Sequence, residues 1–230
     1  SGASGNVIDA DLARSVGLPD QGAAMVGTPA GGTPMRGFRT VIAEGRLGEA
    51  TFSGVRAVAL PMPAMRDLSV QAIMGPGTFS GRLVHLDLGR GEIRITGKEP
   101  GSIPTGQAFP YSDNGPRSLP GVTVEVAGRS YDGHIDTGQP GTLLFPRAMA
   151  EQLPLDGPLR PAGSARMADG VPRALFQARI NGVVRIGPLT FENPEVRFME
   201  GVQRVNVGVA ALRGVVVLLD PAERRSWLLP

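Results

Sequence analysis

The amino-acid sequence predicts an all-β protein of two related lobes around a pseudo-twofold axis, with about one short helix per lobe. The chain has 33 glycines and 21 prolines among 230 residues, a content that favours many tight turns and few long helices. Its apolar runs are short and rich in β-branched residues, as β-strands are. Features of the first half also recur in the second half, which indicates that one strand arrangement is used twice.

The repeat is clearest in two apolar segments that lie 133 positions apart. Four residues of the first segment have identical counterparts in the second: Gly75 and Gly208, Gly81 and Gly214, Leu86 and Leu219, and Asp87 and Asp220. Residues 47–52 resemble residues 186–191 at an offset of 139, and residues 1–8 align with residues 137–144. Loop insertions produce such small changes of offset, so the repeat covers most of the chain.

Local signals place the elements within each lobe. A helix is expected over residues 10–16, with Asp9 as its N-cap and Gly17 as its terminator. A second helix is expected over residues 147–153, with Pro146 suited to its first turn. Residues 122–126 alternate between valine and polar residues, and residues 130–135 follow a turn at Gly128. This pattern predicts a β-hairpin.

The segment from Lys98 to Pro120 carries five prolines, at positions 100, 104, 110, 116 and 120. Such a proline-rich stretch predicts an extended linker. The predicted organisation is therefore an N-terminal lobe over residues 1–97, a linker over residues 98–120 and a C-terminal lobe over residues 121–230.

The composition argues against several kinds of site and partner. The chain has no cysteine, which excludes disulfides, thiolate metal ligands and cysteine nucleophiles. His85 and His134 do not form a pair spaced as metal ligands, so we expect no metal and no cofactor. The 23 basic residues, all arginine except Lys98, form no basic run, so no nucleic acid is expected. The longest apolar run, residues 215–219, is too short to span a membrane.

A predicted strand leads into Asp136-Thr137-Gly138, an apolar strand follows at residues 142–145, and Val207-Gly208 later precedes another apolar strand. This order resembles the aspartic-protease lobe of the retropepsin and pepsin families, which include bacterial aspartyl proteases. The resemblance covers nearly the whole chain, once per half. It implies that Asp136 is catalytic, that Thr137 and Gly138 shape its loop, and that Gly208 packs beneath that loop.

The first lobe begins with Ser1-Gly2-Ala3-Ser4-Gly5, which resembles an Asp-Ser-Gly-Ala-Ser active-site loop without its aspartate. The resemblance implies that Ser1 and Gly2 belong to the second active-site loop and that Gly75 supports it. We therefore expect the chain to be incomplete at its start. The missing aspartate is expected immediately before Ser1, in an N-terminal segment of the same precursor.

The chemistry of these families needs two carboxylates a few ångströms apart. Like charges at that distance cannot both ionise, so the pair holds one proton and titrates as a unit. The ionised oxygen activates a water and the protonated one polarises the scissile carbonyl. The resemblance thus implies an aspartic endopeptidase with a peptide or protein substrate, in a periplasmic or secreted location.

The families also place a β-hairpin flap over the cleft. The candidate residues are Met167, Ala168, Asp169 and Gly170, because Asp-Gly is a strong turn signal; residues 28–33 are their counterpart in the first lobe. His134, two residues before Asp136, is expected to face the same side of its strand as the aspartate. We interpret this histidine as structural.

Three alternatives remain on the sequence alone. The protein could be a catalytically inactive relative that binds extended peptide by strand addition. It could be a homodimer in which each chain contributes Asp136. A carbohydrate-binding or assembly β-sandwich is a different class, in which the aspartate would be incidental.

Overall fold

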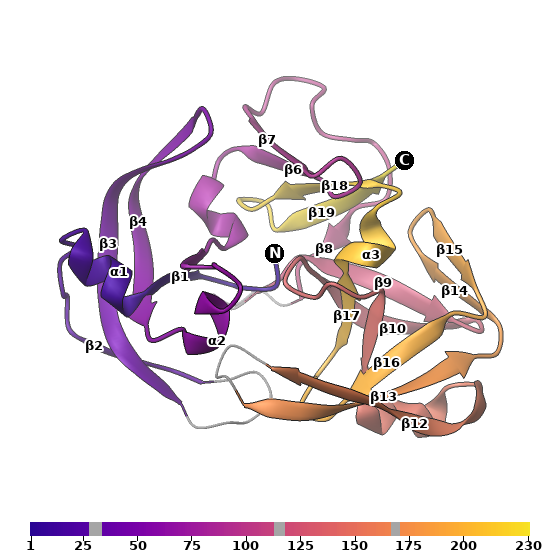
Figure 1. Cartoon of the computed structure of the whole chain (residues 1–230). Coiled ribbons are helices and arrows are strands. Elements are labelled where there is room, and N and C mark those ends of the chain that lie inside the picture. Colours follow the sequence, from indigo (N-terminus) through magenta and orange to yellow (C-terminus); the bar gives the residue numbers. More distant parts are fainter. Residues whose placement is uncertain (28–33, 113–117, 167–170) are drawn as a thin grey trace.

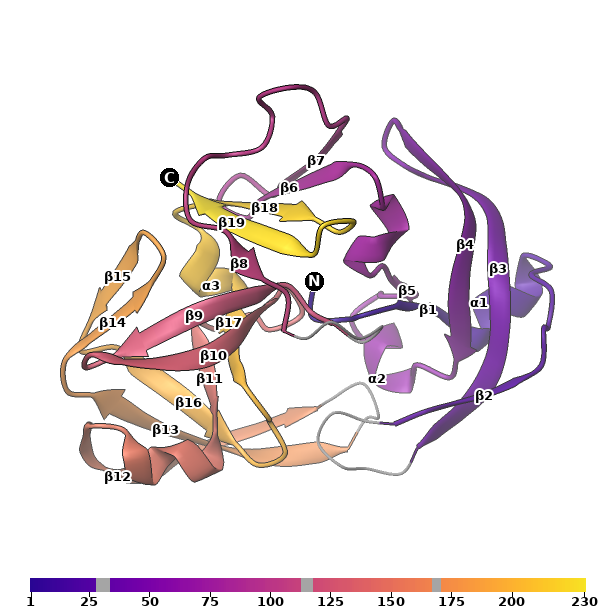
Figure 2. The ribbon, with the colours of Figure 1, turned by 180° about the vertical axis from the view of Figure 1, so that it is seen from behind.

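A computed structural model describes residues 1–27, 34–112, 118–166 and 171–230. Its elements are mostly strands, which confirms the predicted all-β fold, and they form two lobes with a third sheet between them (Figure 1). The chain begins near the centre of the molecule, between the lobes, in both views (Figures 1 and 2). Within the described residues, no helix combines the length and hydrophobicity needed to cross a membrane.

The first lobe contains a five-stranded sheet of order β2-β3-β4-β1-β5. Its strands are β1 (Asn6–Asp9), β2 (Ala23–Val26), β3 (Met35–Leu47), β4 (Ala50–Leu60) and β5 (Ala72–Ile73). Ile8, Phe38 and Ala59 belong to the small apolar core that this sheet forms with the first helix. The alanines of this core, Ala10, Ala13, Ala57 and Ala59, bury less apolar area than larger side chains would.

The second lobe contains a nine-stranded sheet of order β12-β13-β16-β11-β17-β10-β9-β14-β15. The strands are β9 (Gly121–Val126), β10 (Arg129–Asp136), β11 (Leu143–Pro146), β12 (Leu155–Arg166), β13 (Pro172–Ile180), β14 (Val183–Ile186), β15 (Leu189–Glu192), β16 (Glu195–Met199) and β17 (Val205–Gly208). The alternating Val122, Val124 and Val126 are all buried in the largest core cluster. The predicted hairpin is thus present, as strands β9 and β10.

The two lobes share a pattern of strand pairing. Strand β1 pairs in parallel with β4 and antiparallel with β5. Strand β11 likewise pairs in parallel with β16 and antiparallel with β17. Strand β1 in the first lobe and strand β11 in the second lobe therefore each lie between a parallel and an antiparallel neighbour.

The third sheet is built from both halves of the chain, in the order β7-β6-β18-β19-β8 (Figure 2). Its strands are β6 (Leu83–Asp87), β7 (Glu92–Thr96), β8 (Phe109–Pro110), β18 (Val216–Asp220) and β19 (Arg225–Leu229). Strands β6 and β18, which carry the repeated Leu-Asp sequence, pair antiparallel with His85 opposite Leu218. Segments from the two halves of the chain thus meet along one hydrogen-bonded edge.

The first predicted helix is α1 (Ala10–Ser15), which is capped by Asp9 as expected and followed by Gly17 at φ +71°. Asp9 Oδ1 accepts hydrogen bonds from the backbone nitrogens of Asp11 and Leu12, and Arg66 also donates to this carboxylate. Burial alone would raise the pKa of Asp9, but these donors hold it below its usual value. The N-cap is therefore an ionised, well-bonded carboxylate.

The other helical segments are short. The predicted helix over 147–153 is a 3₁₀ helix, η2 (Arg147–Gln152), with Pro146 as its N-cap residue. The sequence did not predict α2 (Pro63–Arg66), η1 (Pro76–Phe79) or α3 (Val209–Leu212). Each is too short to show the periodicity by which helices are recognised in a sequence.

The proline-rich segment is packed against the third sheet. Phe109 is buried and pairs with Ser226 as part of strand β8. Lys98 Nζ lies 2.7 Å from Asp220 Oδ2, and the Asp220 side chain is fully buried. This segment therefore contributes to the core, while the predicted lobe boundaries stay a prediction.

Candidate active site

Asp136 is the last residue of strand β10, which lies between β9 and β17 near the middle of the nine-stranded sheet. The parallel register with β17 sets Asp136 opposite Gly208. Strand β17 pairs with β10 as far as Asp136 and β9 as far as His134, so the carboxylate projects from the end of a paired strand. Such a scaffold suits a reactive group that must keep a fixed position.

The loop that carries Asp136 is tied to the start of the first lobe by three hydrogen bonds. The backbone nitrogen of Ser1 donates to Thr137 Oγ1 at 2.8 Å. Ser1 Oγ in turn donates to the carbonyl of Ile135 at 3.0 Å and accepts from the backbone nitrogen of Thr137 at 3.3 Å. Ser1 and Thr137 therefore exchange hydrogen bonds in both directions across the interface between the lobes.

Gly2 lies directly against the Asp136 carboxylate. A Cβ atom at Gly2 would stand 1.9 Å from Asp136 Oδ1, far inside any allowed contact. A side chain at this position would displace the carboxylate, so this close approach requires glycine. The structure thus brings Ser1, Gly2, Asp136 and Thr137 together.

The two oxygens of Asp136 have different partners. Oδ1 accepts from the backbone nitrogen of Gly138 at 2.9 Å, and Oδ2 accepts from Asn206 Nδ2 at 3.1 Å. Hydrogen bonds of this kind fix the orientation of a carboxylate. Asn206 was not predicted as a site residue, although a lone polar residue within the apolar run of β17 is the signal that could have identified it.

Gly208 lies beneath the active-site loop. Its backbone nitrogen donates to the carbonyl of Thr142 at 2.8 Å, and that of Val209 donates to the carbonyl of Gln139 at 2.9 Å. A Cβ atom at Gly208 would be 2.3 Å from the backbone oxygen of Gly141. The loop and the end of β17 are therefore packed backbone against backbone.

Gly75 has the corresponding place in the first lobe. A Cβ atom there would be 2.9 Å from the backbone oxygen of Gly5. The backbone nitrogen of Gly75 donates to Asn6 Oδ1 at 2.8 Å, and Thr78 Oγ1 donates to the same oxygen. Here a side-chain amide supplies part of the bonding that the backbone supplies in the second lobe.

His134 faces the same side of β10 as Asp136. Its Nδ1 is buried and has no hydrogen-bond partner among the described residues, and the same holds for Asn206 Oδ1. Burial lowers the pKa of His134 below its usual value of 6.5, while the negative charge of Asp136 acts against this shift. The ring is therefore predominantly neutral at neutral pH.

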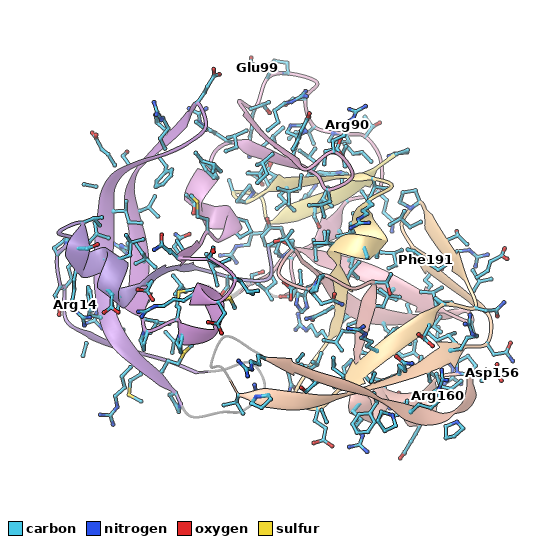
Figure 3. All side chains as sticks on the ribbon, in the orientation of Figure 1. Arg14, Arg90, Glu99, Asp156, Arg160 and Phe191 are labelled. Atoms are coloured by element: carbon cyan, nitrogen blue, oxygen red, sulfur yellow. The ribbon has the colours of Figure 1, made fainter. Side chains whose placement is uncertain are left out.

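Other features lie away from Asp136 or outside the described residues. A cavity of about 390 Å³, lined by Arg147, Phe176 and Glu200 among others, contains none of the residues of the Asp136 loop. Arg14, Arg90 and Arg160 lie at separate edges of the molecule (Figure 3). Across the described ranges, no cluster of three or more histidine, aspartate or glutamate residues suits a metal ion.

The flap candidates Met167, Ala168, Asp169 and Gly170 lie outside the described residues, as do residues 28–33. The strands that flank the first set, β12 and β13, pair antiparallel up to Arg166 and Pro172. The strands that flank the second set, β2 and β3, pair up to Val26 and Met35. The proposed flap residues therefore remain a prediction.

The chain was compared with models of known protein families. Residues 1–76 and 122–214 match a family model described as aspartyl protease. The two matched segments contain both loops that meet at Asp136. No curated protein matches the chain.

Proposed function

The chain belongs to the aspartyl protease family, and on that premise we propose that it is an aspartic endopeptidase with Asp136 as one of two catalytic aspartates. The second is the residue that precedes Ser1 in the full-length protein. The substrate is an extended peptide bound between the two lobes. We also propose, from the family resemblance, a periplasmic or secreted location.

The observation that carries this proposal is the reciprocal hydrogen bonding of Ser1 and Thr137. Each residue uses its backbone nitrogen to donate to the side-chain oxygen of the other. Ser1 thus has the same role in its loop as Thr137 has in the loop of Asp136. The residue before Ser1 then corresponds to Asp136, the residue before Thr137, and its side chain would lie close to the Asp136 carboxylate.

Two aspartates at these positions would share one proton. Mutual repulsion raises the pKa of one carboxyl above that of the other, so the pair titrates in two steps. The ionised carboxylate removes a proton from water as that water attacks the peptide carbonyl, and the protonated one hydrogen-bonds the carbonyl oxygen. Proton transfer to the leaving nitrogen then completes the cleavage.

Peptide binding without cleavage is the second candidate function. Strands β2 and β12 each lie at one edge of their sheet, so each has a backbone edge to which an extended peptide could add. This observation favours peptide recognition whether or not cleavage follows. The residue before Ser1 separates the candidates, because any residue other than aspartate removes the intramolecular pair.

The test uses the full-length protein, with its natural residues before Ser1, and a library of fluorogenic peptides. Cleavage should peak in acid and fall at least about 10³-fold in Asp136→Asn. Asp132→Asn is the matched control, since Asp132 is an exposed aspartate on the same strand. Full activity in Asp136→Asn would exclude the mechanism, and saturable binding without cleavage in the wild-type protein would support the second candidate.

A further inference from the structure

His134, Asn206 and Asp136 lie on one face of two paired strands. In the parallel ladder of β10 and β17, His134 is opposite Asn206 and Asp136 is opposite Gly208. Paired residues place their side chains on the same face of a sheet, and residues two apart on a strand share a face. The Asn206 side chain therefore has His134 beside it on the neighbouring strand and Asp136 diagonally ahead.

The orientation of the Asn206 amide follows from its bond to Asp136. Nδ2 donates to Asp136 Oδ2 at 3.1 Å, and the reversed amide would set its oxygen against the carboxylate. The amide oxygen Oδ1 is then directed away from Asp136 and requires a donor, because an amide oxygen can only accept. Asn206 is buried, with 8% of its surface exposed.

Two buried polar atoms on this face have no hydrogen-bond partner within the described part of the chain. They are Asn206 Oδ1 and His134 Nδ1, one an acceptor and the other able to donate when it carries the ring proton. Leaving either atom unpaired is unfavourable, because a buried polar group loses its hydrogen bonds to water and gains none in return. A hydrogen bond between these adjacent groups, direct or through one water, would satisfy both.

We propose that His134 is a positioning residue for Asp136: its Nδ1–H donates to Asn206 Oδ1, directly or through one water, and so holds the amide whose Nδ2 donates to Asp136 Oδ2. This pairing replaces the purely structural role that the sequence suggested for His134. The effect on catalysis rests on the proposed protease function. The tautomer of His134 and its pairing with Asn206 do not depend on that function.

The charges around the ring agree with a neutral histidine. Burial is the largest influence on the pKa of His134 and lowers it, Asp136 raises it, and Arg204 lowers it. Other groups that face the ring or share its side of the strand are the Ser1 nitrogen and Asp132. A neutral imidazole carries one proton, and the acceptor on Asn206 selects Nδ1 as its location.

Nitrogen-15 NMR of the two histidine rings tests the pairing without any need for activity. His85 is an internal reference, because its Nε2 lies 3.1 Å from Thr96 Oγ1 in the third sheet. We expect His134 in the Nδ1–H tautomer near neutral pH, and a shift toward Nε2–H in Asn206→Leu with the His85 signals unchanged. An Nε2–H tautomer in the wild-type protein, or no change in Asn206→Leu, would overturn the proposal.

A second variant covers the case in which Asn206→Leu does not fold. Asn206→Asp keeps the size of the side chain and sets a carboxylate beside the ring. An adjacent negative charge favours the imidazolium, so the pKa of His134 should rise while that of His85 stays the same. An unchanged His134 pKa would show that the two side chains are not in contact.

The catalytic consequence is tested with two substitutions in the full-length protein. His134→Asn keeps an N–H donor near the position of Nδ1, whereas His134→Leu removes it. We expect kcat to fall about tenfold in His134→Leu with KM little changed, and to be largely restored in His134→Asn. Equal losses in both variants, or no loss, would refute a positioning role. Absence of wild-type cleavage would instead refute the proposed function and leave the NMR result to decide this inference.

Discussion

The backbone nitrogen of Ser1 and the hydroxyl of Thr137 are joined by a 2.8 Å hydrogen bond across 136 positions of the sequence. Thr137→Val would remove the acceptor while keeping the shape of the side chain, and Thr137→Ser would keep the acceptor. We expect Thr137→Val to lower the free energy of unfolding by about 1 kcal/mol and Thr137→Ser to lower it by less. Denaturant titration of both variants measures the difference, and equal stabilities would contradict a role for this bond.

Gly2→Ala would place a methyl group where the Asp136 carboxylate lies, because a Cβ atom at this position would be 1.9 Å from Oδ1. The aspartate must move, so activity of the full-length protein should fall at least about tenfold. Gly5→Ala is the control, as a Cβ atom at Gly5 has no neighbour within 4 Å. Similar kcat/KM values for the two variants would show that the close approach is unimportant.

Gly208→Ala should destabilise the second lobe. The added Cβ would meet the backbone oxygens of Gly141 and Gln139 at 2.3 and 2.5 Å, and backbone atoms in a packed loop cannot move away independently. Overpacking of this kind costs about 1–3 kcal/mol, which a thermal melt would register as a lower Tm. Gly214→Ala serves as the comparison, since a Cβ atom at Gly214 would have its nearest neighbour 3.8 Å away. An equal fall in Tm for the two variants would contradict a role for overpacking at Gly208.

Lys98→Met should lower the free energy of unfolding by about 3 kcal/mol, because it leaves the fully buried Asp220 carboxylate without its cation. Arg90→Met is a suitable control. Arg90 pairs with Asp87 at the surface, with 77% of its side chain exposed, and such pairs contribute about 0–1 kcal/mol. If urea unfolding gave equal losses of unfolding free energy for the two variants, the buried pair would contribute no more to stability than the surface pair.

The low pKa of His134 predicts a pH-dependent stability. Its folded-state pKa lies below the usual 6.5, so the unfolded chain binds the proton more readily. The contribution of neutral His134 to the free energy of unfolding is fully present above about pH 6.5. It is lost as the pH falls through the lower pKa of the folded state. We expect His134→Asn to lose less stability than the wild-type protein between pH 7 and pH 5. Parallel pH–stability curves for the two proteins would rule out this contribution.

Local signals predicted the elements that depend on neighbouring residues. The alternation of Val122, Val124 and Val126 identified strand β9 because one face of the strand is buried. Asp9 identified the start of α1 because its side chain bonds to the next turn of the chain. In both cases the decisive contacts lie within a few residues of each other, where sequence patterns are informative.

Contacts between distant residues were not predictable in the same way. Phe109 belongs to a strand only because it meets Ser226, and its proline-rich surroundings suggested a linker. Asn206 reaches Asp136 across 70 positions, so its role depends on the register between β10 and β17. The predicted repeat nevertheless placed Ser1 and Gly2 in the predicted site, because it rests on a direct comparison of the two halves of the chain.

The pairing of β6 with β18 also bears on how the protein can be divided for study. Each strand supplies the other with a hydrogen-bonding neighbour, centred on His85 and Leu218. Expression of either half alone would leave one of these apolar strands with an unsatisfied edge, which is a template for self-association. Solubility and refolding yield should therefore collapse when the halves are produced separately and recover when they are co-expressed, so the smallest practical unit contains both.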